Sequence, residues 1–292
     1  MNPLSIALNA FRGFLIGVAE VIPGVSGGTI ALIVGVYQRI INSAAAFTKG
    51  VLQLRTLNFA ALGKEFKKID LALLIPLGIG MLSAIVVAAA ALEPLLENEP
   101  EVMRGLFFGM ILVSLVVPYK MAAKSWAAKD YLIGLIAAAI ALGLLSLPRA
   151  AEFEPNLLIV FLGATVAICA LVLPGVSGSF LLLALGLYAP TIAAVNDRNW
   201  AYLLVFVLGA VVGLGAFSTL LSWLLENRRR ITLVIMTGLM LGSLRALWPW
   251  QQEQGGVLAP TTFEPLIALA AGVLVVGGLI LWQAKLDSRS HQ

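Results

Sequence analysis

The chain has 292 residues, of which 60% are hydrophobic and 12% are charged, and its formal net charge is +4. A mean hydropathy of +0.99 excludes an ordinary water-soluble domain, whose composition is far more polar. The single cysteine, Cys169, and the single histidine, His291, exclude disulfides, zinc sites and histidine nucleophiles, and we expect no metal and no cofactor.

The apolar segments predict an all-α polytopic membrane protein. Runs of ~20 apolar residues are long enough to cross a hydrocarbon core of ~30 Å. In chain order, the expected elements are a helical hairpin at 4–46, transmembrane helices at 69–92, 103–121 and 130–147, a second hairpin at 157–195, and transmembrane helices at 202–225, 231–247 and 264–284. The segment 52–66 mixes apolar and basic residues, so we expect it to lie on the cytoplasmic surface of the membrane.

The two hairpins carry the same sequence motif. Residues 21–37 match residues 172–188 in constant register, and both stretches contain Pro-Gly-Val-Ser-Gly. We call residues 23–27 the first motif and residues 174–178 the second motif. A match of this length in one register indicates an internal repeat.

The repeat extends beyond the motifs. Gly109 and Ser114 correspond to Gly238 and Ser243, in the second transmembrane helix of each half. We therefore expect two repeats, each made of one hairpin and three transmembrane helices: residues 1–150 and residues 151–292.

Charges in the loops alternate in sign along the chain. The positive-inside rule places the basic loops in the cytoplasm: Lys49, Arg55, Lys64, Lys67 and Lys68, then Lys120, Lys124 and Lys129, then Arg228, Arg229 and Arg230, and finally Lys285 and Arg289. The intervening acidic residues are expected outside: Glu93, Glu97, Glu99 and Glu101, then Glu152 and Glu154, then Asp197, and then Glu253. Loops of this kind act as topology signals, so nucleic acid is not an expected partner, and both termini are expected in the cytoplasm.

This topology makes the two hairpins enter the membrane from opposite faces, so the repeats are inverted. Hairpin arms such as 157–173 and 179–195 would each be ~25 Å long at 1.5 Å per residue, slightly short of a full span. We therefore favour re-entrant hairpins, whose tips meet near the membrane centre, over pairs of fully spanning helices.

Each motif predicts a break in a helix, because proline lacks an N–H and glycine adopts conformations that other residues resist. The helix that starts at the break would direct its N–H groups and its dipole into the membrane interior, which suits an anion. The residues expected at this anion site are Gly24, Ser26, Gly27, Gly28 and Thr29 from the first hairpin and Gly175, Ser177, Gly178 and Ser179 from the second. Tight packing through small residues is the simpler explanation for one motif, but two motifs brought together favour the site.

Three charged residues lie within apolar segments, namely Arg12, Glu20 and Arg245. Each costs ~3 kcal/mol at mid-bilayer, which marks it as a functional candidate. Arginine suits a phosphate because its planar group donates two parallel hydrogen bonds. Anchoring at the membrane surface is the alternative for both arginines. Glu20 either pairs with an arginine or carries a proton, and the sequence does not choose between these roles.

Several of these residues form a combination that is typical of one protein family. They comprise Arg12-Gly13, Glu20 with residues 22–29, residues 173–180 and residues 242–250. Over essentially its whole length, the chain resembles the bacterial undecaprenyl phosphate transporter family. The resemblance implies a flippase in the bacterial cytoplasmic (inner) membrane that returns undecaprenyl phosphate from the outer to the inner leaflet, for reuse in envelope polysaccharide synthesis. It also implies alternating access around a phosphate site near the membrane midplane.

An undecaprenyl pyrophosphate phosphatase is an alternative, since these enzymes also have inverted repeats and a Pro-Gly-x-Ser-Arg-Ser motif. Gly27 and Gly178 stand where that arginine would be, and no Glu-x-x-x-Glu pair accompanies Glu20. Charge stabilisation and metal binding of the phosphatase kind are therefore lacking, and we expect no enzyme. A small-anion transporter or channel would use the same helix ends. The sequence leaves open the coupling ion, a proton or sodium, and whether the protein is a homo-oligomer.

Cysteine labelling checks the predicted topology. Once Cys169 is replaced by alanine, single cysteines at Glu99 and Glu253 should react in intact cells with a membrane-impermeant maleimide, because acidic loops are expected outside. A cysteine at Lys67 should react only after the cells are permeabilised. Labelling of position 67 from outside would contradict the inverted arrangement of the two halves.

Overall fold

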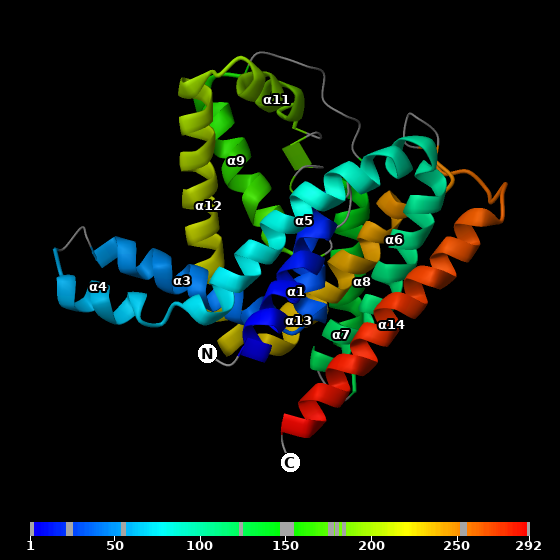
Figure 1. Ribbon diagram of the computed structural model, residues 1–292, viewed down its shortest axis with the longest axis horizontal. Helices are drawn as coiled ribbons and strands as arrows, with labels where there is room; N and C mark the ends of the chain where they lie inside the picture. Colours follow the sequence, from blue (N-terminus) through cyan, green and yellow to red (C-terminus); the bar gives the residue numbers. More distant parts are fainter. Residues whose placement is uncertain are drawn as a thin grey trace.

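The computed structural model describes residues 3–21, 26–53, 57–122, 125–146, 155–174, 178, 181–182, 185–251 and 256–290. In these ranges the regular secondary structure is helical, apart from one isolated β-bridge between Gln251 and Val257 (Figure 1). The first half contains α1 (Pro3–Val21), α2 (Gly27–Ile33), α3 (Tyr37–Gln53), α4 (Phe59–Phe66), α5 (Leu71–Asn98), α6 (Pro100–Ser114), α7 (Val116–Ala122) and α8 (Ala128–Leu144). The second half contains α9 (Leu157–Val172), α11 (Tyr188–Asn196), α12 (Trp200–Asn227), α13 (Arg229–Ser243), the 3-10 helix η2 (Leu244–Leu247) and α14 (Glu264–Ser290).

The helices have the lengths and surfaces of membrane-spanning segments. Among the described residues, four helices are long and apolar enough to cross a membrane by themselves: Pro100–Ala122, Trp200–Asn227, Arg229–Leu247 and Glu264–Leu281. Large apolar side chains such as Leu204 and Leu208 of α12 are exposed on the outside of the molecule. Water would penalise such a surface, whereas lipid tails do not. The prediction of an all-α polytopic membrane protein is confirmed.

The hairpins differ from the expected pair of straight arms. Gly35 and Gly186 have φ angles of 75° and 70°, a left-handed conformation that costs glycine little. After each glycine, the next backbone N–H donates back to α2 or its counterpart: Val36 donates to the carbonyl of Ala31 at 3.0 Å, and Leu187 donates to that of Leu182 at 2.8 Å. The expectation of one continuous second arm, such as 179–195, is therefore wrong. The chain turns at each glycine, and α2 and α3 are bent by 118° relative to each other.

Four helix pairs form most of the body. Within each half, the first arm of the hairpin packs on the first transmembrane helix that follows it, as α1 on α5 and α9 on α12. Between the halves, α6 packs on α14 and α13 packs on α8. The second transmembrane helix of one half therefore lies against the third of the other, and this exchange joins the halves.

Glycines allow these helices to approach closely. A Cβ atom on Gly109 would lie 2.0 Å from the carbonyl oxygen of Leu269, and one on Gly238 would lie 2.2 Å from that of Gly134. Gly109 and Gly238 are matched positions of the repeat, so both interfaces between the halves use the same contact. Close backbone approach supplies the van der Waals attraction that holds helices together in lipid.

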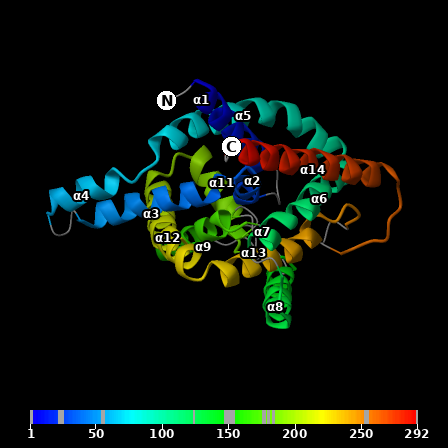
Figure 2. The same cartoon turned by 90° about the horizontal axis from the view of Figure 1, so that it is seen from below.

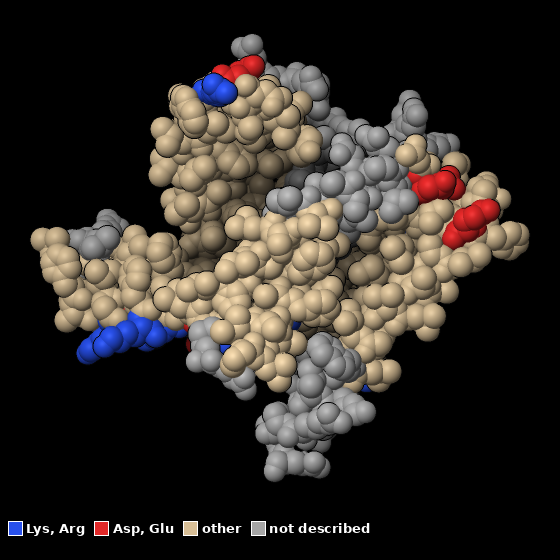
Figure 3. Space-filling model, viewed as in Figure 1, with Lys and Arg blue, Asp and Glu red and all other residues tan. Residues whose placement is uncertain are grey.

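Two helices extend sideways from the body. Both α3 and α4 project from it in the two perpendicular views (Figures 1 and 2). An ion pair of 2.6 Å between Arg39 and Asp70 ties α3 to the residue that precedes α5. In Figure 3, basic residues gather along the lower edge beneath α4, and acidic residues lie at the opposite edge near the ends of α6 and α14. A basic and an acidic group also lie together at the top left, so the charges on this face lie at its edges with uncharged surface between them.

Two glycines of α5 provide a matched test of the packing. A Cβ atom on Gly80 would lie 1.9 Å from the carbonyl oxygen of Ala10, whereas one on Gly78 would meet nothing within 4 Å. Gly80→Ala should therefore push α1 from α5 and lower the free energy of unfolding by ~1–3 kcal/mol. Gly78→Ala should change it little. Denaturation of both variants in the same detergent measures the difference, and equal stabilities would contradict the α1–α5 interface.

Candidate functional site

The first motif contacts the helix that leads into the second motif. The hydroxyl of Ser26 donates to the carbonyl of Leu173 at 3.2 Å. The hydroxyl of Tyr37 donates to the carbonyl of Val172 at 3.0 Å, and a Cβ atom on Gly28 would lie 2.9 Å from the same oxygen. Residues far apart in the sequence thus meet at the end of α9, next to the proline of the second motif.

Polar side chains are buried at this meeting point. Ser26 is 2% exposed, Thr29 is 0% exposed and Tyr37 is 4% exposed. A proline follows the last turn of α9, so the final carbonyls of that helix have no intrahelical partner. Side chains from the first half supply the missing donors, which satisfies a backbone that lipid could not.

An internal carboxylate stands at the start of α2. The side chain of Glu20 accepts a hydrogen bond from the backbone N–H of Gly27. A Cβ atom on Gly27 would lie 2.1 Å from its Oε1 atom. The sequence predicted either an arginine partner or a proton for this carboxylate. The structure places it where an anion was expected, at the first N–H of the helix after the break.

The equivalent position of the second half lacks a charge. A Cβ atom on Gly178 would lie 2.7 Å from the carbonyl oxygen of Ala167 and 3.0 Å from Cβ of Leu171. In the register of the repeat, Leu171 is the counterpart of Glu20. Both motif glycines therefore pack against the arm that precedes them, and the two halves differ in what they meet there.

Some predicted residues are not part of this description. Gly24, Gly175, Ser177 and Ser179 lie outside the described residues. Among the side chains that the structure does describe, no group of three or more His, Cys, Asp or Glu residues could hold a metal ion.

The two arginines of the predicted site lie on different helix pairs. Arg12 is half-buried on α1, and its Nη1 donates to Oδ1 of Asn9 at 3.1 Å. Asn9 in turn donates to the carbonyl of Ala72 on α5 at 3.4 Å. Arg245 is half-buried on η2, which packs on α6 and α13. Arg12 thus belongs to the α1–α5 pair, and Arg245 to the region where the halves exchange helices.

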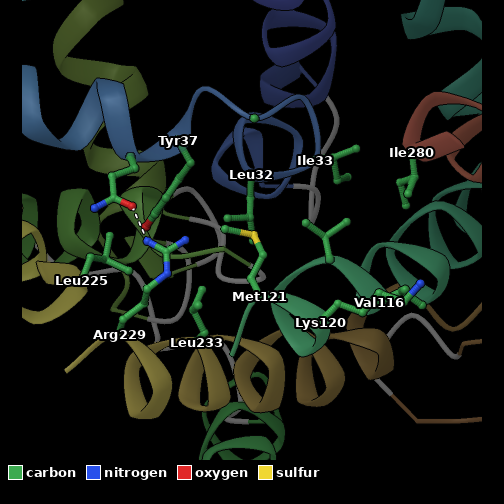
Figure 4. A pocket seen from close by; sticks show the side chains of 13 residues that line it. Leu32, Ile33, Tyr37, Val116, Lys120, Met121, Leu225, Arg229, Leu233 and Ile280 are labelled. Atoms are coloured by element: carbon green, nitrogen blue, oxygen red, sulfur yellow. Dashed lines mark hydrogen bonds between the residues drawn. The ribbon is translucent and has the colours of Figure 1, made fainter. Parts of the chain in front are cut away.

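Sequence reasoning missed a cavity beside Tyr37. It has a volume of about 490 Å³ and is lined by the turn between α2 and α3, by α7, by the ends of α12 and α13 that face each other, and by α14 (Figure 4). Lys120 and Arg229 contribute charge to a largely apolar lining. The sequence indicated only a topology role for these two residues. The cavity is formed by six helices that are distant in the sequence, so it becomes visible only in the folded protein.

Comparisons with known proteins agree on one family. A family model described as VCA0040-like, undecaprenyl phosphate translocase-like, matches residues 16–263. A protein of Vibrio cholerae serotype O1 named polyprenyl-phosphate transporter is 38% identical over 252 residues, which cover 86% of this chain and 80% of the relative. A protein of Staphylococcus aureus with the same name is 28% identical over 260 residues, 83% of this chain and 86% of that relative. No solved structure matches the chain.

Two matched tyrosines test the contact between α3 and the end of α9. Tyr37→Phe removes the donor to the Val172 carbonyl and should lower the free energy of unfolding by ~1 kcal/mol, because a buried acceptor loses its partner. Its repeat counterpart, Tyr188, is 42% exposed, and Tyr188→Phe should be close to neutral. Denaturation of both variants in detergent gives the comparison. Equal effects would mean that the Tyr37 hydroxyl does not join the two halves.

Proposed function

We propose a transport function from the fact that the chain belongs to the undecaprenyl phosphate translocase-like family. In this proposal the protein carries a polyprenyl phosphate across the membrane that it spans. The substrate is undecaprenyl phosphate, moved from the outer to the inner leaflet of the bacterial cytoplasmic membrane for reuse in envelope polysaccharide synthesis. The protein acts as a flippase and not as an enzyme. The names of the two relatives support the substrate class.

The chemistry of the substrate sets the problem. A polyprenyl tail is soluble in the bilayer throughout the reaction, whereas a charged phosphate pays a large desolvation cost in hydrocarbon. Only the head group therefore needs a protected polar route. A transporter of this kind requires a site inside the membrane that can be reached from either face.

The contact of Ser26 and Tyr37 with the end of α9 carries this proposal. Ser26 and Tyr37 donate hydrogen bonds to the last carbonyls of α9, so the start of α2 and the end of α9, which flank the two motifs, lie together. We take residues 1–150 and 151–292 as inverted repeats with re-entrant hairpins. The matched turns at Gly35 and Gly186 and the exchanged pairs α6–α14 and α13–α8 support that division. Two similar halves around one site give inward-facing and outward-facing states of similar energy, as alternating access requires.

In this proposal the phosphate binds where the motif residues converge. Its ligands are Ser26, Thr29 and the amides of Gly27 and Gly28 from the first hairpin, and the matching residues of the second. Glu20 holds the Gly27 amide in the structure, and a phosphate arriving there must displace that carboxylate, because like charges repel at close range. Glu20 therefore closes the polar route when no substrate is bound. A proton or sodium ion as coupling ion would act through the same carboxylate.

Arg12 and Arg245 assist on the route rather than at one point. Arg12 lies within α1, the helix that leads to the first motif. Arg245 lies on η2, which contacts α6. Each can donate two hydrogen bonds to a phosphate that passes it. The head group would meet them in succession.

A leaflet-accessibility assay tests transport. Vesicles with undecaprenyl phosphate in both leaflets are treated from outside with a soluble phosphatase that cannot cross the membrane. With the wild-type protein the inner-leaflet pool should also become accessible, and protein-free vesicles should retain it. Supplied with undecaprenyl pyrophosphate instead, the purified protein should release no inorganic phosphate. Phosphate release that increases with the amount of purified protein and is lost in Ser26→Ala would show that the protein is a phosphatase and not a transporter.

The role of Arg245 is tested in the same vesicles. Arg245→Lys keeps the charge but loses the planar pair of donors, so transport should slow; Arg245→Ala should be slower still, because a buried phosphate then lacks a charged partner. A loss of about tenfold or more is expected for alanine, since hydrogen bonds to charged groups are worth ~1.5–3 kcal/mol. Full transport by Arg245→Ala at equal protein levels would reduce this residue to an anchor.

A further inference from the structure

Helices α3 and α4, which we call the arm, leave the body where two membrane-spanning helices meet. Asn42 of α3 accepts a hydrogen bond from the hydroxyl of Ser222 on α12 at 3.0 Å. Gln38 of α3 accepts one from Arg229, the first residue of α13, at 2.7 Å. Because α12 and α13 are each long enough to cross the membrane, the junction between them lies at a membrane surface. From this level the arm runs sideways (Figures 1 and 2).

The arm is fixed to the body at its base. Arg39 of α3 forms an ion pair with Asp70 at 2.6 Å, and the backbone N–H of Asp70 donates to the hydroxyl of Ser43 at 3.1 Å. Helix α4 packs back on α3, since a Cβ atom on Gly50 would lie 2.6 Å from the ring of Phe66. The exposed side chains of the arm are therefore held in a set direction relative to the body.

The arm exposes large apolar side chains from both of its helices. Phe47 and Val51 lie one turn apart on α3, and Phe59 and Phe66 lie two turns apart on α4; all four are exposed. The rings of Phe47 and Phe66 meet edge to face, with centroids 5.7 Å apart. This contact joins the apolar side chains of the two helices into one surface. Such a surface suits the upper part of the acyl chains, just beneath the lipid head groups.

The arm also carries exposed lysines. Lys64 and Lys67 are exposed at the end of α4, and Figure 3 shows basic side chains along the lower edge of the molecule beneath this helix. Lys68 forms an ion pair with Glu65 at 2.5 Å. Among the residues that the structure describes, Lys64 and Lys67 have no ion-pair partner. Two uncompensated ammonium groups beside an apolar surface are complementary to negative head groups above acyl chains.

The packing of the body does not explain α4. None of its residues is buried. Residues 54–70 separate α3 from α5 and contain α4, whereas only residues 197–199 separate α11 from α12 at the corresponding place of the second half. The repeated frame can thus be built without this helix, so its apolar and basic side chains require another explanation.

We propose that the arm is a binding surface for anionic phospholipids, such as phosphatidylglycerol, in the leaflet at the basic end of the molecule. The apolar side chains lie among the upper acyl chains, and Lys64 and Lys67 attract the phosphates of the head groups. Each of these lysines enriches the anionic lipid about fivefold near α4. This lipid is bound at the surface and is not carried across the membrane, so the proposal does not depend on the transport function.

Topology signals alone would also explain the lysines, and two matched double variants separate the explanations. Lys64→Gln/Lys67→Gln removes two positive charges from the arm. Arg228→Gln/Lys129→Gln removes two positive charges from exposed positions outside the arm, at the α12–α13 junction and at the start of α8. A topology signal predicts the same lipid next to α4 in both variants, whereas a binding surface predicts a change in the first variant only.

The experiment measures which lipid lies next to α4. A fluorophore is attached to Gly63→Cys in a Cys169→Ala background, because a Cβ atom on Gly63 meets nothing within 4 Å. The full-length protein is reconstituted into phosphatidylcholine vesicles that contain a small fraction of a doxyl-labelled quencher, either phosphatidylglycerol or phosphatidylcholine. Labelled phosphatidylglycerol should quench severalfold more strongly. At ~1 M salt, where the Debye length is ~3 Å, this difference should largely disappear.

The double variants complete the test. Lys64→Gln/Lys67→Gln should remove most of the preference for phosphatidylglycerol, and Arg228→Gln/Lys129→Gln should leave it within about twofold of the wild type. Thermal unfolding midpoints establish that both variants are folded.

Three results would overturn the proposal. Equal quenching by the two lipids in the wild type would show that the arm does not select anionic lipid. An equal loss of preference in both double variants would assign it to the overall charge of this end of the molecule. Quenching by neither lipid, together with self-quenching between labels on two copies, would make the arm a contact between copies of this chain.

Discussion

The structure depends on how a broken helix satisfies its backbone inside a membrane. The helix α9 ends just before the proline of the second motif, and α2 begins at the last glycine of the first motif; lipid offers no hydrogen bonds to helix ends. Ser26 and Tyr37 supply donors to the last carbonyls of α9, and Glu20 accepts from the first amide of α2. These bonds hold the break in one place, and they also gather polar groups at one point. The polar environment that a phosphate needs is therefore a consequence of the same requirement that stabilises the hairpins.

Helix packing turns this local contact into one body. Glycines at matched positions bring α6 against α14 and α13 against α8, so each half completes the other. At the basic face, Arg230 forms an ion pair with the buried Asp130 at the start of α8. Inside each half, α1 packs on α5 and α9 packs on α12. Such interfaces are rigid because small residues leave no space for the backbones to move closer.

The two halves share a backbone plan and differ in chemistry. In the register of the repeat, Glu20 corresponds to Leu171, Gln38 to Ala189 and Tyr37 to Tyr188. Tyr37 is buried and bonded, whereas Tyr188 is exposed. Matched positions of the two halves therefore carry different polar groups, although both halves turn at a left-handed glycine.

The sequence by itself determined the helical class, the positions of most helices within a few residues and the family, because apolar length, repeat register and rare motif residues are local properties of the chain. It also gave the location of the breaks, since proline and glycine act on their own backbone. Only the tertiary structure decided that the second arms turn at Gly35 and Gly186, that Glu20 reaches the Gly27 amide, and that Lys120 and Arg229 share a cavity. Those features depend on distances between segments that are remote in the chain, and neither periodicity nor charge counts contain those distances.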